Sequence, residues 1–222
     1  MNQGVWKCVC FCIAMLIVVV AEGQSNIPRT DTQNWNDVYL SVPLARRVDF
    51  LMQFTDRNGR DLSRPVDERI GVGFSFKAGK YLTFIPNYLY IGMQPFKGRK
   101  VFEDRLSVVT LTRLPIGRFA LVQRNIFERR LRHPGINATR YRNRLQIEHA
   151  IGPAKKHINL FVNDEVFYDW SFNAWVRNRF GIGAAKTFNK HVSGDLYYMR
   201  QNDSHSLPGD LNILGTALRF KL

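Results

Sequence analysis

Alternation of apolar and polar residues most constrains how this chain folds. The segment RIGVGFSFK places Val72, Phe74 and Phe76 on one side of an extended strand, with small or charged residues between them. A period of two is typical of β-strands, because successive side chains of a strand point to opposite faces. The pattern recurs along the chain, and no convincing amphipathic helix interrupts it, so an all-β fold is predicted.

Turn signals divide the alternating pattern into eleven segments. Short turns such as KAGK alternate with longer polar connections such as DRNGRDLSRPVD, which is typical of an outer-membrane barrel. The segments expected to form strands are 38–44, 48–54, 69–77, 81–92, 99–112, 117–132, 138–149, 158–170, 174–187, 190–202 and 210–222.

An even strand number is the rule for single-chain bacterial barrels. A twelfth strand is therefore expected from SNIPRTDTQNW, residues 25–35, with ten strands as the alternative. The predicted fold is a closed, antiparallel transmembrane β-barrel. A soluble β-sandwich is the competing interpretation of the same alternation.

The amino-terminal residues resemble a secretory signal peptide. Lys7 precedes 14 apolar residues, which is short for a transmembrane helix, and small residues then lead to a cleavage site before Gln24. Residues 1–23 are expected to be removed and 24–222 to form one barrel domain; an uncleaved anchor is the alternative. All three cysteines lie in the signal segment, so a disulfide or cysteine metal site is not expected in the mature chain.

The last residues predict how the chain reaches its membrane. LGTALRFKL alternates to the end of the chain, as in a terminal strand recognised by the barrel assembly machinery, although Leu222 stands where phenylalanine is usual. The expected location is the outer membrane of a Gram-negative bacterium, in contact with lipid and lipopolysaccharide.

A formal net charge of +14 predicts anionic partners. Export makes nucleic acid an unexpected partner. Small anionic solutes are expected instead, and cations of the connections are candidates for binding lipopolysaccharide phosphates: Arg57, Arg60, Arg64, Lys97, Arg99 and Lys100.

Several segments resemble a known bacterial family. YLTFIPNYLYIG, RYRNRLQIE, DEVFYDW and FNKHVSGDLYYMRQND are similar to the domain of unknown function 2490, and the resemblance runs from Trp35 onward. It implies an outer-membrane β-barrel-like fold, and it assigns no catalytic residue.

Four arginines recur along the chain. Arg69, Arg105, Arg144 and Arg179 each follow a polar residue, and successive arginines are 36, 39 and 35 residues apart. The spacing is that of one barrel hairpin, so each is expected in the outer portion of a descending strand. A charge on the lipid face costs about 2–4 kcal/mol near the midplane, so these arginines are expected to form an inward ring.

The same alternation assigns other charged residues to the lumen. The expected anion-binding set is Arg69, Arg105, Arg124, Arg130, Arg142, Arg144, Arg177 and Arg179. The expected counter-charges are Glu103, Glu128, Glu148 and Asp195, with Glu165 as a further candidate.

An arginine-lined lumen predicts passage or binding of small anions, because guanidinium groups hold carboxylates and phosphates. A closed structural or interaction barrel is the alternative, since narrow barrels are often packed with side chains. An outer-membrane enzyme ranks third, and the chain is expected not to be one. His191 and Asp195 share a strand face, but neither a catalytic triad nor a metal-ligand spacing is recognisable, and no cofactor is expected.

Overall fold

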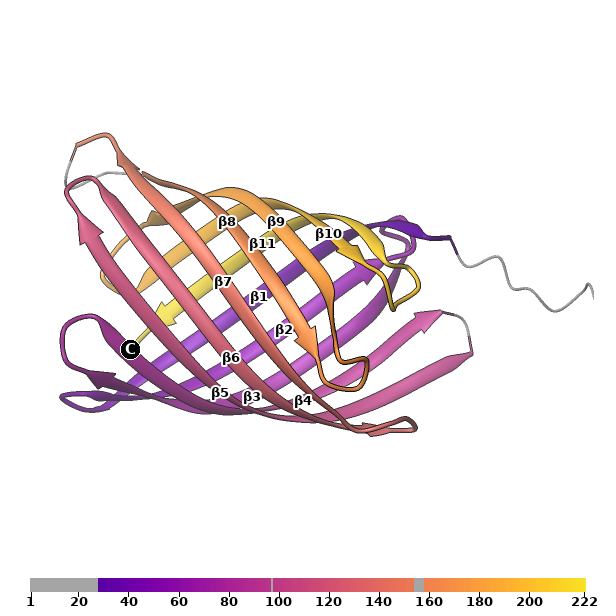
Figure 1. Ribbon diagram of the computed structural model, residues 1–222. Helices are drawn as coiled ribbons and strands as arrows, with labels where there is room; N and C mark the ends of the chain where they lie inside the picture. The colour runs from indigo at the N-terminus through magenta and orange to yellow at the C-terminus, as the bar shows by residue number, and fades with distance from the viewer. Residues whose placement is uncertain (1–27, 97, 154–157) are drawn as a thin grey trace, which may run out of the picture.

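A computed structural model describes residues 28–96, 98–153 and 158–222, and these residues form eleven strands that close into a barrel (Figure 1). Every strand pairs with the next along the chain. The predicted all-β closed barrel is therefore confirmed. The predicted signal peptide, residues 1–23, lies outside the described residues.

The strands are long, as the extended alternation predicts. In chain order they are β1 (Thr30–Ala45), β2 (Val48–Gly59), β3 (Arg64–Ala78), β4 (Leu82–Phe96), β5 (Arg99–Ile116), β6 (Phe119–His133), β7 (Ala138–Ile151), β8 (Ile158–Asp169), β9 (Ala174–Thr187), β10 (Val192–Asp203) and β11 (Asp210–Lys221). Within the described ranges, no helix is long and apolar enough to cross a membrane.

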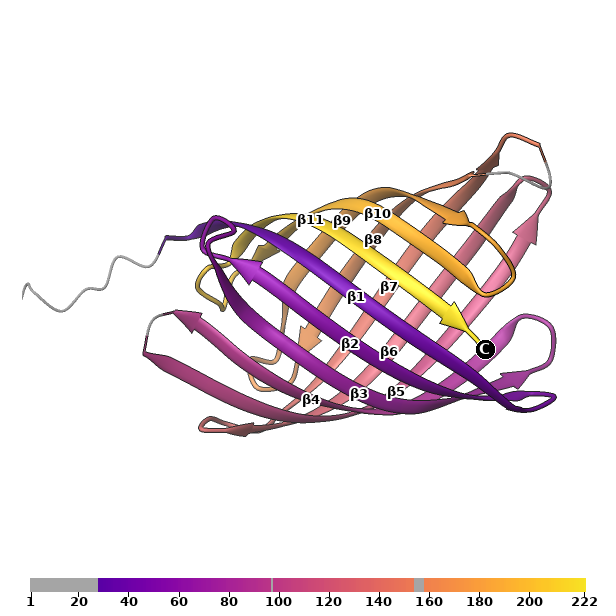
Figure 2. The same cartoon turned by 180° about the vertical axis from the view of Figure 1, so that it is seen from behind.

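The strand number of twelve, with ten as the alternative, is wrong, and so is a wholly antiparallel sheet. Residues 30–35, expected to lie in a separate strand, are the first half of β1. Each hairpin reverses direction, so the first and last of eleven strands run the same way. β1 and β11 consequently close the barrel in parallel, from Thr30 opposite Asp210 to Ser41 opposite Lys221 (Figure 2).

The two ends of the barrel are named here by the strands that meet them. β1 begins at the amino end, and β11 finishes at the carboxyl end, close to the marked C-terminus (Figure 1). The connections at the amino end are shorter than expected, because strands extend into them. Arg57, for example, pairs with Asp67 across β2 and β3 instead of lying in a loop.

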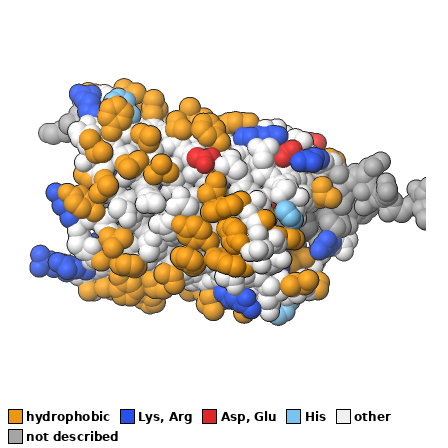
Figure 3. Space-filling view, in the orientation of Figure 1, with side chains coloured by type: hydrophobic (Ala, Val, Ile, Leu, Met, Phe, Trp, Pro, Cys, Tyr) orange, Lys and Arg blue, Asp and Glu red, His pale blue; other side chains and the backbone are white. Residues whose placement is uncertain are grey.

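The outer surface is apolar over much of its length. Leu106, Ile147 and Leu196 point away from the lumen and are each more than half exposed. Figure 3 shows hydrophobic side chains along the visible face of the barrel, with lysine and arginine gathered towards its ends. Alternation therefore directs apolar side chains outward and leaves the inner face to a different set of residues.

The inner face combines charged residues with tightly packed aromatic ones. Trp35, Leu211 and Ile213 form a buried cluster where β1 meets β11. The ring of Tyr197 lies against Gly215, where any Cβ atom would overlap the ring. These contacts narrow the lumen and help to shape the cavity described below.

Candidate functional site

The eight arginines predicted to face the lumen fall into two groups. Those that line a single cavity are Arg69, Arg105, Arg124, Arg142, Arg144 and Arg179. Arg130 and Arg177 lie nearer the amino end, where they pair with Glu103 and Asp203. All four regularly spaced arginines belong to the cavity group.

Three glutamates bind most of these arginines. Glu103 is fully buried, and its carboxylate forms ion pairs with Arg105 at 2.6 Å, Arg130 at 2.8 Å and Arg132 at 3.3 Å. It projects from β5, whereas Arg130 and Arg132 project from β6. Glu103 therefore links two strands in the amino-end part of the lumen.

Glu128 and Glu165 continue this network around the wall. Glu128 on β6 pairs with Arg140 at 2.6 Å and Arg142 at 2.9 Å. Glu165 on β8 pairs with Arg142 at 2.8 Å and Arg124 at 2.7 Å. Among the described residues, seven arginines contact Glu103, Glu128 or Glu165, so positive charge exceeds negative charge within the network.

Two buried aromatic rings fill the space between these charges. The guanidinium carbon atoms of Arg142 and Arg179 lie 4.7 and 4.8 Å from the centre of the Phe167 ring. Arg57 lies 3.6 Å from the centre of the Trp35 ring. Guanidinium groups are attracted to aromatic faces, so rings and charges together pack the amino-end part of the lumen.

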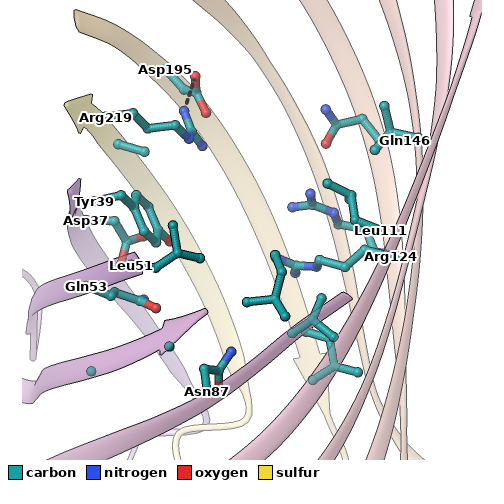
Figure 4. Close-up of a pocket in the computed structure, with 18 of the residues that line it drawn as sticks. Asp37, Tyr39, Leu51, Gln53, Asn87, Leu111, Arg124, Gln146, Asp195 and Arg219 are labelled. Atoms are coloured by element: carbon teal, nitrogen blue, oxygen red, sulfur yellow. Dashed lines mark ion pairs between the residues drawn. The ribbon is translucent and has the colours of Figure 1, made fainter. Parts of the chain in front are cut away.

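A cavity of about 680 Å³ lies on the carboxyl-end side of this network. It reaches Ser41, Thr187 and Arg219 near the ends of their strands. Figure 4 shows Tyr39, Leu51 and Asn87 on one side of it, facing Leu111, Arg124 and Gln146 on the other. The lumen is thus packed towards the amino end and hollow towards the carboxyl end.

The predicted counter-charges occupy two places. Glu103 and Glu128 belong to the network described above. Glu148 pairs instead with Arg113 at 2.6 Å, and Asp195 pairs with Arg219 at 2.7 Å (Figure 4). Within the described residues, neither of these two carboxylates forms an ion pair with Arg124 or Arg144.

Arg124 and Arg144 stand directly opposite each other on β6 and β7. Arg124 is held by Glu165, and its buried Nε atom has no hydrogen-bond partner. Glu165 is also opposite Arg144, but its carboxylate is engaged by other arginines. Over the part of the chain that the structure describes, Arg144 has no hydrogen-bonded or ion-paired partner for its guanidinium group, and its Nε atom is buried.

Apolar side chains on the inner face were not expected. Val122 and Ile126 flank Arg124 along β6, and Leu111 lies opposite it on β5. All three line the cavity. Val108 and Val109 are adjacent within LSVVTL, and the run FALV is apolar throughout; these were the available signals that both faces of β5 and β6 carry apolar groups.

His191 and Asp195, expected to share a strand face, do not pair with each other, and His191 precedes the first residue of β10. An imidazole nitrogen of His191, Nδ1, lies 2.7 Å from the backbone oxygen of Lys221, while Asp195 binds Arg219. Among the described residues, no three His, Cys, Asp or Glu side chains are placed to hold a metal ion together.

Arg57, one of the basic residues assigned to outer connections, lies in β2 instead, whereas Arg60 does lie in the connection between β2 and β3. Arg57 points inward, over Trp35 and 3.6 Å from Asp67. Arg60 donates a hydrogen bond to the backbone oxygen of Gln94. Lys97 lies outside the described residues.

Solved structures resemble this barrel at low sequence identity. LpxR from Salmonella typhimurium matches with a TM-score of 0.50 and 8% identity, covering 78% of this chain and 83% of that one. The beta domain of the Bordetella autotransporter BrkA matches with a TM-score of 0.39 and 10% identity, covering 72% of this chain and 79% of that one. The siderophore receptor PirA from Pseudomonas aeruginosa matches with a TM-score of 0.30 and 13% identity, covering 74% of this chain and 32% of that one. At these identities the likeness shows the fold alone.

The expectation that the chain is not an enzyme is contradicted. LpxR is an outer-membrane lipid A deacylase. A barrel with this fold therefore can be an enzyme, and the fold gives no ground for excluding catalysis.

Sequence comparison agrees with the resemblance found from the quoted segments. No curated protein sequence matches the chain. A family model described as "Protein of unknown function (DUF2490)" matches residues 32–211, which is most of the chain and nearly all of the barrel. The chain therefore belongs to the protein family DUF2490.

Proposed function

We propose that this protein is an outer-membrane β-barrel whose lumenal cavity binds small organic anions. The membrane setting is supported by the apolar outer surface, which a water-soluble barrel would leave in contact with solvent. A closed barrel also satisfies its backbone hydrogen bonds within lipid, because it has no free strand edge. The fold likeness to LpxR supports the same location.

Exposed aromatic residues lie near both ends of the outer surface, as expected if each group marks one interface of a bilayer. Tyr90, Phe102 and Tyr198 lie outside towards the amino end, and Phe119 and Phe220 lie outside towards the carboxyl end. Aromatic belts of this kind are typical of barrels at the boundaries of a bilayer. β11 is the last strand of the chain and is the strand that the barrel assembly machinery would recognise.

The unpaired guanidinium of Arg144 is the observation that carries the binding function. It lines a cavity, faces Arg124 across a strand pair, and forms no ion pair with any carboxylate of the described residues, since Glu165 opposite it is bound by other arginines. Like charges directly opposite each other are unfavourable, and a buried charge without a partner is costly. A bound carboxylate or phosphate supplies the missing negative charge and accepts hydrogen bonds from both guanidinium groups.

Binding is favoured over free passage by the distribution of side chains along the lumen. Glu103, Glu128, Glu165 and the rings of Trp35 and Phe167 pack the part between the cavity and the amino end. The cavity extends to strand ends on the opposite side. An anion is therefore expected to enter and leave through the carboxyl end.

The carboxyl end carries charges that would attract such an anion. Asp49, Glu148 and Asp195 near this end are already bound by Lys77, Arg113 and Arg219. The exposed cations around them are Arg46, Arg47, Lys80, Arg118, Lys190 and Lys221. A cleft bordered by charges of one sign raises the local concentration of the opposite ion.

Calorimetric titration with benzoate tests this function. The refolded barrel in zwitterionic nanodiscs is expected to bind one benzoate, whereas neutral benzamide of the same shape should bind far more weakly. Arg144→Gln should lower benzoate affinity about tenfold or more, because a hydrogen bond to a charged group contributes about 1.5–3 kcal/mol. Arg118→Gln removes the same charge from the exposed rim and is the matched control. Equal binding by wild type and Arg144→Gln would overturn the assignment.

A further inference from the structure

The two arginines of the cavity have different surroundings. Arg144 has polar inward neighbours along β7, Arg142 and Gln146. Arg124 is bordered by Val122 and Ile126 along its own strand and by Leu111 across the β5–β6 pair. Its guanidinium group therefore extends from an apolar patch towards a second cation.

The apolar patch continues away from the arginine pair. Val109 lies opposite Ile126, and Ile85 on β4 lies opposite Val109. Both line the cavity. Figure 4 shows Leu111 next to Arg124 and near Gln146 on the same wall. One wall of the cavity thus passes from hydrocarbon, over β4–β6, to cationic and polar groups, over β6–β7.

We propose that the ligand is an amphipathic anion, with one carboxylate or phosphate group on a short hydrocarbon or aromatic body; this inference rests on the anion-binding function proposed above. A wholly hydrophilic anion would pair with Arg144 but leave the apolar patch in contact with water. A neutral apolar molecule would cover the patch but leave Arg144 without a counter-charge. A ligand with both parts satisfies both surfaces at once.

The cavity size suits such a molecule. Its volume of about 680 Å³ falls within the roughly 300–1,000 Å³ of small-molecule sites. Each CH₂ group buried from water contributes about 0.8 kcal/mol, which corresponds to about a fourfold gain in affinity. Affinity should therefore rise steadily with the length of the hydrocarbon part.

Trp35 provides a reporter within the site. Its ring is buried and lines the cavity, whereas Trp170 and Trp175 are exposed. In a full-length chain with all other tryptophans replaced by phenylalanine, a brominated ligand in the cavity should quench the fluorescence of Trp35. The probes are 3-bromopropionate, 6-bromohexanoate and the neutral 6-bromohexan-1-ol, with empty zwitterionic nanodiscs used to correct for partition into lipid.

The expected result is a clear order of affinity. Three additional methylenes should make 6-bromohexanoate bind about tenfold to sixtyfold more tightly than 3-bromopropionate, depending on how fully they are buried. The neutral alcohol should bind more weakly than the six-carbon acid. Leu111→Asn should reduce the ratio between the two acids, whereas Arg144→Gln should weaken both acids. Competition by hexyl phosphate distinguishes a phosphate headgroup from a carboxylate.

The outcomes separate this inference from the function on which it rests. If both acids bind equally and Arg144→Gln weakens both, the anion site stands and the amphipathic ligand is rejected. If the alcohol binds as tightly as the six-carbon acid, the arginines do not recognise the ligand and both proposals fail. Absence of saturable quenching by either acid, in a barrel verified as folded, also rejects both.

Discussion

Arg124 and Arg144 face each other across the β6–β7 pair, and only Arg124 has a carboxylate partner within the described residues. The carboxylate of Glu165 is shared by Arg124 and Arg142, at 2.7 and 2.8 Å. Arg144 is consequently a cation placed beside another cation in a partly enclosed space. This arrangement costs stability in the empty barrel and gives an incoming anion a site to bind.

Replacing Arg144 with methionine should stabilise the empty barrel. The change removes the repulsion from Arg124 while retaining much of the side-chain volume. Like charges directly opposite each other are destabilising, and the expected gain is about 0.2–1 kcal/mol, the size of other cross-strand pair contributions. Urea unfolding followed by gel mobility would measure the change. A marked loss of stability would mean that Arg144 has a structural partner and is not free for a ligand.

Replacing Glu165 with glutamine should have the opposite effect. Arg124 and Arg142 would lose their shared carboxylate, and removing one member of a buried ion pair costs about 3–5 kcal/mol. Glu148→Gln is the matched control: its partner Arg113 is about half exposed, with 51% of its side chain accessible, and such pairs contribute about 0–1 kcal/mol. Similar unfolding midpoints for the two variants would argue against a central role for Glu165.

The parallel closure of the barrel predicts a pattern of engineered disulfides. Asn34 lies opposite Leu214, and Val38 lies opposite Leu218. Paired cysteine substitutions at either couple should cross-link, since the chain has natural cysteines only at positions 8, 10 and 12. If β1 and β11 ran antiparallel, residues four positions further along both strands would not lie opposite each other, so only one of the two cysteine pairs could form. Cross-linking of only one couple would therefore contradict the parallel register.

The membrane setting predicts that arginine is poorly tolerated at the middle of the outer surface. Leu145 lies halfway along β7 and faces outward, whereas Ile151 is at the strand end. Leu145→Arg should destabilise the barrel in lipid vesicles by about 2–4 kcal/mol, and Ile151→Arg by about 0–1 kcal/mol. A soluble barrel would tolerate both changes, because both positions would already be in water.

Local alternation was sufficient to locate the strands and divide their residues between two faces. In RYRNRLQIE, the charge of Arg144 and the apolar side chain of Leu145 settle the directions of both residues. The same rule, applied across the chain, placed the regularly spaced arginines inside. The number of strands could not be predicted from local alternation. It was inferred from the rule that bacterial barrels have an even number of strands, but residues 30–35 extend β1 and add no strand.

The pairing of charges could not be obtained from alternation alone. Glu165 meets Arg124 from β6, Arg142 from β7 and Arg179 from β9, so its role depends on the register of four strands. Phe167 lies two residues after Glu165 on β8 and therefore shares its face, and this was a signal for the inward position of Phe167. Its contacts with several guanidinium groups required the closed barrel. Arg57 was assigned to a connection because the length of β2 was underestimated.

The most direct test locates the bound anion. Crystals of the barrel soaked with 4-bromobenzoate should show a bromine anomalous peak inside the cavity, with the carboxylate towards Arg124 and Arg144 and the ring against Leu111. The same soak of Arg144→Gln should show little or no peak there. A lumen without bromine in the wild-type crystal, while the protein in solution is saturated by the same ligand, would contradict the proposed site.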